Sequence, residues 1–206
     1  MDQNVILVET VPLEFDLESL GCRLRIRPGQ TKFMDRLSRL AEEAARVARL
    51  CGLTILDEEK VQVGEVTFSS PLLRQKMDGL GRAFPYLASE GTELADWSLS
   101  LSSSLEQVFA SALREVAVQQ AENLLERTLL ERYGIAQVSA MNPGSLKVWS
   151  LEEQVPLFEL LAPLPEKLGV TLLPSLMMRP EYSVSGVFFQ TDSKFYNCQL
   201  CPKKEC

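Results

Sequence analysis

Three cysteines near the end of the chain have the spacing of a metal site. Cys198, Cys201 and Cys206 form the pattern C-x2-C-x4-C. A C-x2-C turn directs two thiolates toward one point, which suits zinc or an iron–sulfur cluster, although both usually take four ligands. Cys22 or Cys51 could complete the set only if the fold brings one of them near. The pattern predicts a zinc or iron–sulfur centre in a cysteine-rich tail, 198–206, with free thiols on a frayed terminus as the alternative.

Histidine is absent from all 206 residues. This excludes Ser-His-Asp and Cys-His nucleophilic catalysis, His-ligated zinc and any imidazole general base. Carboxylates remain available for binding. Glu122 and Glu126 lie one helical turn apart, where they could hold a cationic amino group, but most pairs of this kind are simply solvated.

The composition is that of a folded protein with an acidic surface. Hydrophobic residues make up 46% of the chain, charged residues 24%, and the net charge is −7. This charge disfavours nucleic-acid and anionic-membrane partners, because both need clustered cations. One basic stretch, 22–49, fits a solvated helix face. With no long apolar run and an odd number of cysteines, we expect a cytoplasmic protein.

Hydrophobic periodicity predicts an α+β fold. Apolar residues recur every three or four positions over 102–132, with Gly134 after them, which indicates one long central helix. We expect a single domain, 1–197, with a mixed or antiparallel twisted sheet packed against helices. The other predicted helices are 31–51, 70–77 and 150–161, and the predicted strands are 4–10, 24–27, 60–68, 84–88, 135–141, 170–173 and 184–190.

Several segments of the second half occur together, in order and spacing, in one known family. They are 141–146, Trp149, 153–154, 157–158, 166–172, 175–180, 183–189 and 192–196. The run Ser183-Val-Ser-Gly186 leading to Asp192-Ser-Lys-Phe-Tyr196 is the most specific. This half resembles the activation domain of cobalamin-dependent methionine synthase. Upstream, 68–73, 89–91 and 103–105 look like the short, free-standing bacterial members of that family.

The resemblance implies a role in corrinoid chemistry. The family's domain binds S-adenosylmethionine and packs over a corrinoid-carrying domain, so that an inert cob(II)alamin is reduced and remethylated. The expected function is therefore an accessory protein that docks on a corrinoid-binding protein or the cobalamin domain of methionine synthase. A separate electron donor would supply the electron, and the partner would carry the cobalamin. The alternative is a metal- or iron–sulfur-binding electron-transfer module that binds no S-adenosylmethionine.

The resemblance also implies a set of ligand-binding residues. They are the loop Asn142, Pro143, Gly144 and Ser145, the strand residues Ser183, Ser185 and Gly186, and the aromatic pair Phe195 and Tyr196. In the family the main chain at the Asn142 position meets adenine, and aromatic rings can stack on adenine or attract a sulfonium. Each group also has an ordinary structural reading: a type I or II turn, small residues packed under a helix, and a strand-end pair of rings.

Two positions depart from the family pattern. Its loop reads Arg-x-x-x-Gly-Tyr, and in this chain Ala140 stands in place of the Arg and Ser145 in place of the Tyr. The loss removes a planar, bidentate partner for the methionyl carboxylate. Lys147, the nearest basic residue, offers a single-point contact instead. We therefore predict weak affinity for the methyl donor, and a cleft in which loop 142–149 lies beside strand 183–190 and the Phe195–Tyr196 pair.

Overall fold

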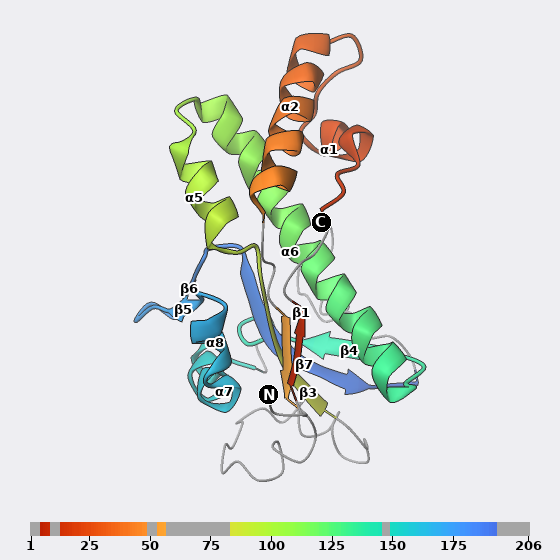
Figure 1. Cartoon of the computed structure of the whole chain (residues 1–206), viewed down its shortest axis with the longest axis vertical. Helices are drawn as coiled ribbons and strands as arrows, with labels where there is room; N and C mark the ends of the chain where they lie inside the picture. The colour runs from red at the N-terminus through yellow and green to blue at the C-terminus, as the bar shows by residue number, and fades with distance from the viewer. Residues whose placement is uncertain (1–4, 9–12, 49–52, 57–82, 146–148, 193–206) are drawn as a thin grey trace.

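The protein is a single α+β domain built around one antiparallel sheet. The computed structural model describes residues 5–8, 13–48, 53–56, 83–145 and 149–192, with the backbone alone for 5–8 and 53–56. Helices cover both faces of the sheet, and a bundle of helices extends beyond one end of it (Figure 1). The fold class predicted from the sequence is confirmed, and the sheet is antiparallel rather than mixed.

Five strands form the main sheet in the order β1-β2-β3-β7-β4, and each neighbouring pair is antiparallel. The strands are β1 (Val5–Val8), β2 (Leu53–Leu56), β3 (Ala83–Ser89), β4 (Val138–Met141) and β7 (Ser183–Gln190). β3 and β7 are the central pair, in register from Ala83 opposite Phe189 to Ser89 opposite Ser183. A separate hairpin pairs β5 (Thr171–Leu172) with β6 (Met178–Arg179).

The helices fall into two groups. α1 (Leu17–Arg23), α2 (Thr31–Val47), α5 (Thr92–Ser100) and α6 (Ser104–Tyr133) form the larger group. On the other face lie a 3-10 turn (Leu151–Glu153), α7 (Gln154–Leu161) and the short α8 (Leu164–Lys167). No helix of the described residues is both long enough and apolar enough to cross a membrane.

The long helix α6 connects the bundle to the sheet. Its buried positions recur at helical spacing from Phe109 to Leu129, and it ends at Gly134, whose φ of 62° is the left-handed conformation that glycine adopts readily. Its first half packs with α2 and α5, and its second half lies beside the sheet (Figure 1). The predicted central helix is thus confirmed, and it positions side chains at both ends of the sheet.

Alternation along β3 and β7 divides the core in two. Phe84, Tyr86 and Phe188 belong to a cluster with α2, α5 and α6, whereas Leu87 and Phe189 belong to a cluster with α7 and α8. Successive side chains of a strand point to opposite faces, so both faces of these strands are buried. Trp149, fully buried, fills the second cluster just after the loop that follows β4.

Most predicted elements within the described residues are confirmed, but one strand is wrong, and three helices and two strands were not predicted. Residues 24–27 are not a strand: they follow α1 as a turn in which Ile26 N donates to Gly21 O and Arg25 has a φ of 57°. Leu24 and Ile26 pack inward from that turn, which imitates strand alternation. The missed helices are α1, α5 and α8, and the missed strands are β2 and β6. The predicted elements 60–68 and 70–77 lie outside the described residues.

The basic stretch is balanced by acidic residues of α6. Arg36 of α2 donates twice to Glu106, and Arg23 of α1 pairs with Glu115. These pairs are partly exposed, so each contributes little to stability. They nevertheless show that the positive face of α1 and α2 is turned toward a neighbouring helix.

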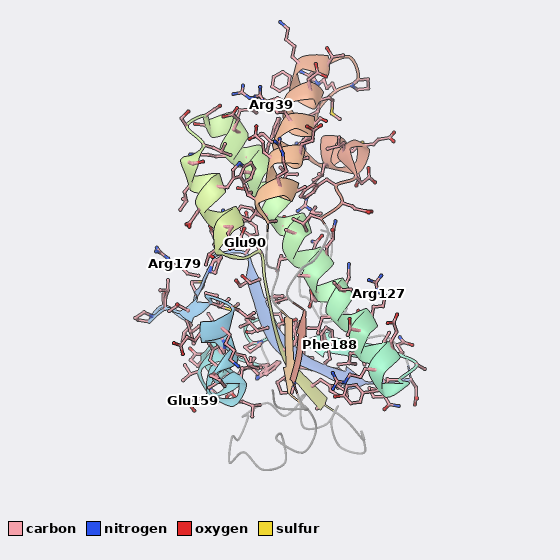
Figure 2. All side chains as sticks on the ribbon, viewed as in Figure 1. Arg39, Glu90, Arg127, Glu159, Arg179 and Phe188 are labelled. Carbon is pink, nitrogen blue, oxygen red and sulfur yellow. The ribbon has the colours of Figure 1, made fainter. Side chains whose placement is uncertain are left out.

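A buried ion pair joins three parts of the fold. The carboxylate of Glu90, which follows β3 and has no exposed surface, accepts from Nε of Arg114 at 2.5 Å and from Nη2 at 2.6 Å. Tyr182 N donates to the same carboxylate, and Glu90 N donates to Tyr182 O. Burial raises the pKa of Glu90, against the opposing effect of Arg114. β3, α6 and the start of β7 thus meet at Glu90 (Figure 2).

Replacing the buried carboxylate should destabilise the whole domain. We expect Glu90→Gln to lower the free energy of unfolding by about 3–5 kcal/mol, because the guanidinium of Arg114 stays buried without its counter-charge. Glu115→Gln is the matched control. It breaks the partly exposed pair of Glu115 with Arg23, next to Arg114 on α6, which is worth about 0–1 kcal/mol. Urea denaturation measures both. Equally small losses would contradict a structural role for the buried pair.

Candidate functional site

The loop after β4 is a tight turn. Ser145 N donates to Asn142 O at 3.2 Å, Pro143 and Gly144 occupy the two central positions, and Gly144 has a φ of 79°. A positive φ at the third residue is the mark of a type II turn. A Cβ at Gly144 would also lie 2.8 Å from Cδ1 of Leu151. Of the two turn types left open by the sequence, the backbone therefore adopts type II. Glycine is needed at position 144 both for its positive φ and for the lack of space beside Leu151.

The side chain of Asn142 ties this turn to the central strands. Its Nδ2 donates to the hydroxyl oxygen of Tyr86 at 2.7 Å and to the carbonyl oxygen of Ser185 at 3.0 Å. Tyr86 lies on β3 and Ser185 on β7. The predicted proximity of the loop and strand 183–190 is therefore observed, through one amide group that contacts two strands.

Tyr86 extends the contact to the long helix. Its hydroxyl donates to Oε1 of Glu122 at 2.5 Å, and its ring stacks on Phe188 with centroids 4.1 Å apart. Burial first, and the Glu122 carboxylate second, raise the pKa of Tyr86 well above its ordinary value. The phenol therefore stays protonated and donates to Glu122 while it accepts from Asn142.

Gly186 leaves room for these side chains. A Cβ at this position would lie 2.6 Å from Nδ2 of Asn142, 2.9 Å from a ring carbon of Tyr86, and closest of all to the carbonyl oxygen of Met141. Only glycine fits so close to backbone. Tyr86, Glu122, Asn142, Ser185 and Gly186 thus form one connected group, here named the Tyr86 cluster.

The predicted binding residues divide between two faces of the sheet. Ala140 and Gly186 share the face toward α6 with Tyr86, as alternation along β4 and β7 requires. Ser183 lies on the other face, where its Oγ donates to Pro180 O at 2.7 Å and bonds to Ser89 Oγ. Ser185 shares that face, contributing only its carbonyl to the Tyr86 cluster, and its buried Oγ has no hydrogen-bond partner among the described residues.

The remaining predicted site residues lie outside the described residues. These are Lys147, the aromatic pair Phe195 and Tyr196, and the cysteines Cys198, Cys201 and Cys206. Cys22 is exposed and makes no disulfide, and no group of three metal-ligating residues occurs within the described part of the chain. The assignment of the loop and strand residues to a ligand, and of the tail to a metal, stays a prediction.

Two carboxylates act on the hydroxyl of Tyr86. Among the described residues, Glu122 and Glu126 both raise its pKa. Such surroundings suit an ammonium or sulfonium group and oppose a carboxylate. The cluster offers amide, phenol and carboxylate groups for binding and orientation.

Sequence reasoning missed Tyr86 and the Glu90–Arg114 pair. A signal was present: Tyr86 carries the only polar side-chain tip within the segment 83–88, and Glu90 follows that buried strand directly. Their partners, however, are Asn142, Glu122 and Arg114, which lie 24 to 56 positions away in the sequence. Spacing alone therefore could not pair them.

Comparison with known proteins identifies the fold. No family model matches the sequence, and no curated protein does. Among solved structures, the chain is similar to the MetH reactivation domain bound to AdoHcy, with a TM-score of 0.59 and 15% sequence identity. The match covers 93% of this chain and 80% of that chain. The likeness shows a shared fold along nearly the whole length.

Removing one hydroxyl should test the Tyr86 cluster. We expect Tyr86→Phe to lower the free energy of unfolding by about 1–3 kcal/mol, because Glu122 and Asn142 each lose a hydrogen bond in a buried place. Tyr182→Phe is the control, since its ring can stay over Arg114, 4.5 Å from the guanidinium carbon, and it should change stability by less than about 0.5 kcal/mol. Urea denaturation distinguishes them. An unchanged free energy of unfolding in Tyr86→Phe would contradict a stabilising role for the Tyr86 cluster.

Proposed function

We propose that this protein docks on a corrinoid-binding protein and supports its reductive reactivation, with S-adenosylmethionine as the methyl donor. The observation that carries the proposal is the fold shared with the MetH reactivation domain, a domain that has been crystallised with AdoHcy. The sequence motifs of the second half point to the same family. AdoHcy is what remains of S-adenosylmethionine after methyl transfer, so this neighbour makes methyl-donor chemistry the natural assignment.

The Tyr86 cluster supports a position for the donor against the backbone of the 142–145 turn, because the loop itself packs directly on β7. Asn142 holds the turn against both central strands. The resemblance assigns the main chain at this position to contact with adenine. A ligand bound to a rigid backbone loses less entropy on the protein side than one bound to a mobile loop. Gly144 leaves the tip of the turn without a side chain, which permits close approach.

The charges favour one end of the donor over the other. The carboxylates of Glu122 and Glu126 suit its ammonium and sulfonium groups. The methionyl carboxylate meets no guanidinium from β4, because Ala140 stands where the family has Arg. In this proposal the donor therefore binds through its adenosine and cationic parts, and affinity is weaker than in relatives that keep the Arg.

Chemistry at the cobalt needs little from this chain. The partner's cobalamin would supply the bond-forming chemistry and a separate reductant the electron, so the proposed role of this protein is to hold the donor and exclude water. The absence of histidine agrees with such a role, since no step requires an imidazole.

Restoring the family residues should tighten donor binding. We expect weak binding of S-adenosylmethionine and AdoHcy to the wild type, and a gain of at least about tenfold in Ala140→Arg/Ser145→Tyr, because a charge-assisted hydrogen bond contributes about 1.5–3 kcal/mol. Ala136→Arg is the control: it adds the same charge at an exposed position just before β4. Titration calorimetry measures all three.

Two outcomes would contradict this account of the loop. Tight binding by the wild type would mean that the carboxylate is held by other groups. No gain in the double variant, or an equal gain in Ala136→Arg, would mean that position 140 does not face the donor.

Docking is tested separately with a cobalamin-loaded partner domain. We expect weak, reversible association through an interface near the low end of about 1,200–2,000 Å². Sedimentation of the full chain with the cobalamin domain in its cob(II)alamin and methylated forms, and with the cobalamin-free domain as control, measures it. Absence of association in every cobalt state would reject the docking role.

A further inference from the structure

A cavity of about 370 Å³ lies between α5, α6 and the β5–β6 hairpin. It is lined by residues of all three elements, among them Asp96, Leu99, Arg114, Thr171, Arg179 and Glu181. None of its lining residues belongs to the Tyr86 cluster. Its volume falls within the range of small-molecule pockets.

The floor of this cavity is a buried guanidinium with a free nitrogen. The side chain of Arg114 is only 10% exposed, and its Nε and Nη2 donate hydrogen bonds to Glu90. Nη1 has one charged neighbour among the described residues, the Glu181 carboxylate at 3.9 Å, which is beyond hydrogen-bond distance. The N–H groups of Nη1 are therefore available to a ligand, on a side chain held in place by Glu90 and the ring of Tyr182.

The rim carries two charged side chains without an ion-pair partner among the described residues. Asp96 of α5 and Arg179 of β6 both line the cavity, and neither forms an ion pair within the described residues. Figure 2 shows Arg179 on the β5–β6 hairpin. The lining thus holds two guanidinium groups and two carboxylates. A ligand with a single charge would be repelled either by the two guanidinium groups or by the two carboxylates. A ligand with one positive and one negative group could be attracted to both kinds of side chain.

We propose that this cavity binds a free α-amino acid with an apolar side chain. Arg114 and Glu181 present opposite charges side by side, as an α-amino acid presents its carboxylate and its ammonium on one carbon. The carboxylate would accept from Nη1 of Arg114 and from Arg179, and the ammonium would donate to Glu181 and Asp96. Ala95, Leu99 and Pro180 supply an apolar wall for the side chain, and Leu99, 79% exposed, is otherwise left to solvent. The site is independent of the proposed methyl-donor function.

The test of the proposal is to titrate the full chain with L-leucine, L-methionine and L-valine and to measure binding by calorimetry. Two analogues of leucine serve as ligand controls: 4-methylpentanoate lacks the ammonium, and 3-methylbutylamine lacks the carboxylate. We expect at least one amino acid to bind at millimolar concentration or below, and both analogues to bind at least about tenfold more weakly.

Variants then locate the site. Arg179→Gln and Asp96→Asn change exposed side chains that the fold does not use, and each should weaken amino-acid binding by about tenfold or more. Arg127→Gln and Glu159→Gln remove a charge of each sign outside the cavity and should leave binding unchanged. Thermal unfolding of every variant verifies that it is folded.

Three results would overturn the proposal. The first is no binding of any of the three amino acids at millimolar concentration. The second is analogue binding as tight as that of leucine, which would mean that the two charges are not read together. The third is equal loss in the cavity variants and the control variants, or no loss in either.

Discussion

The ion pair of Glu90 and Arg114 is the constraint on which the rest of this structure depends. A carboxylate without exposed surface is costly unless its charge is matched and its lone pairs are taken. Here the guanidinium of Arg114, through two hydrogen bonds, and the backbone N–H of Tyr182 donate to the Glu90 carboxylate. The pair therefore holds the end of β3, the middle of α6 and the entrance to β7 in one arrangement, and a shift of any of them would leave a buried charge unmatched.

The same arrangement positions both places where ligands are proposed to bind. α6 carries Arg114 toward the hairpin cavity and, two turns later, Glu122 toward Tyr86. β3 likewise places Tyr86 on the sheet and Glu90 at its end. Because helix and strand are both rigid, each side chain is held at a set position relative to the other. One ion pair and one helix thus organise two chemically different surfaces.

Close backbone approach is the second constraint. β4, β7 and β3 meet where Gly186 faces the amide of Asn142, and any larger residue would push the loop away from the sheet. The loop turn is in turn set by Gly144, packed against Leu151. Small residues at these points let polar side chains cross between strands. The acidic character of the cluster, from Glu122 and Glu126, then decides which part of a ligand it would attract.

The sequence by itself determined the local elements, since periodicity reflects which face of a helix or strand is buried. It predicted α6 with its glycine stop, the strands β3, β4 and β7, the α+β class and the proximity of the loop to β7. It failed at 24–27, where a turn packs alternate residues inward. It also missed α1, α5, α8, β2 and β6, whose short spans carry little periodic signal.

Only the tertiary structure decided which distant residues meet. Tyr86 with Asn142 and Glu122, and Glu90 with Arg114, are pairs separated by many positions in the chain, and local pattern carries no information on such contacts. It also separated Ser183 and Ser185 from Gly186, although they are neighbours in one motif. The physical reason is the pleat of the strand, which turns alternate side chains to opposite faces, so a ligand on one face meets the side chains of one set only.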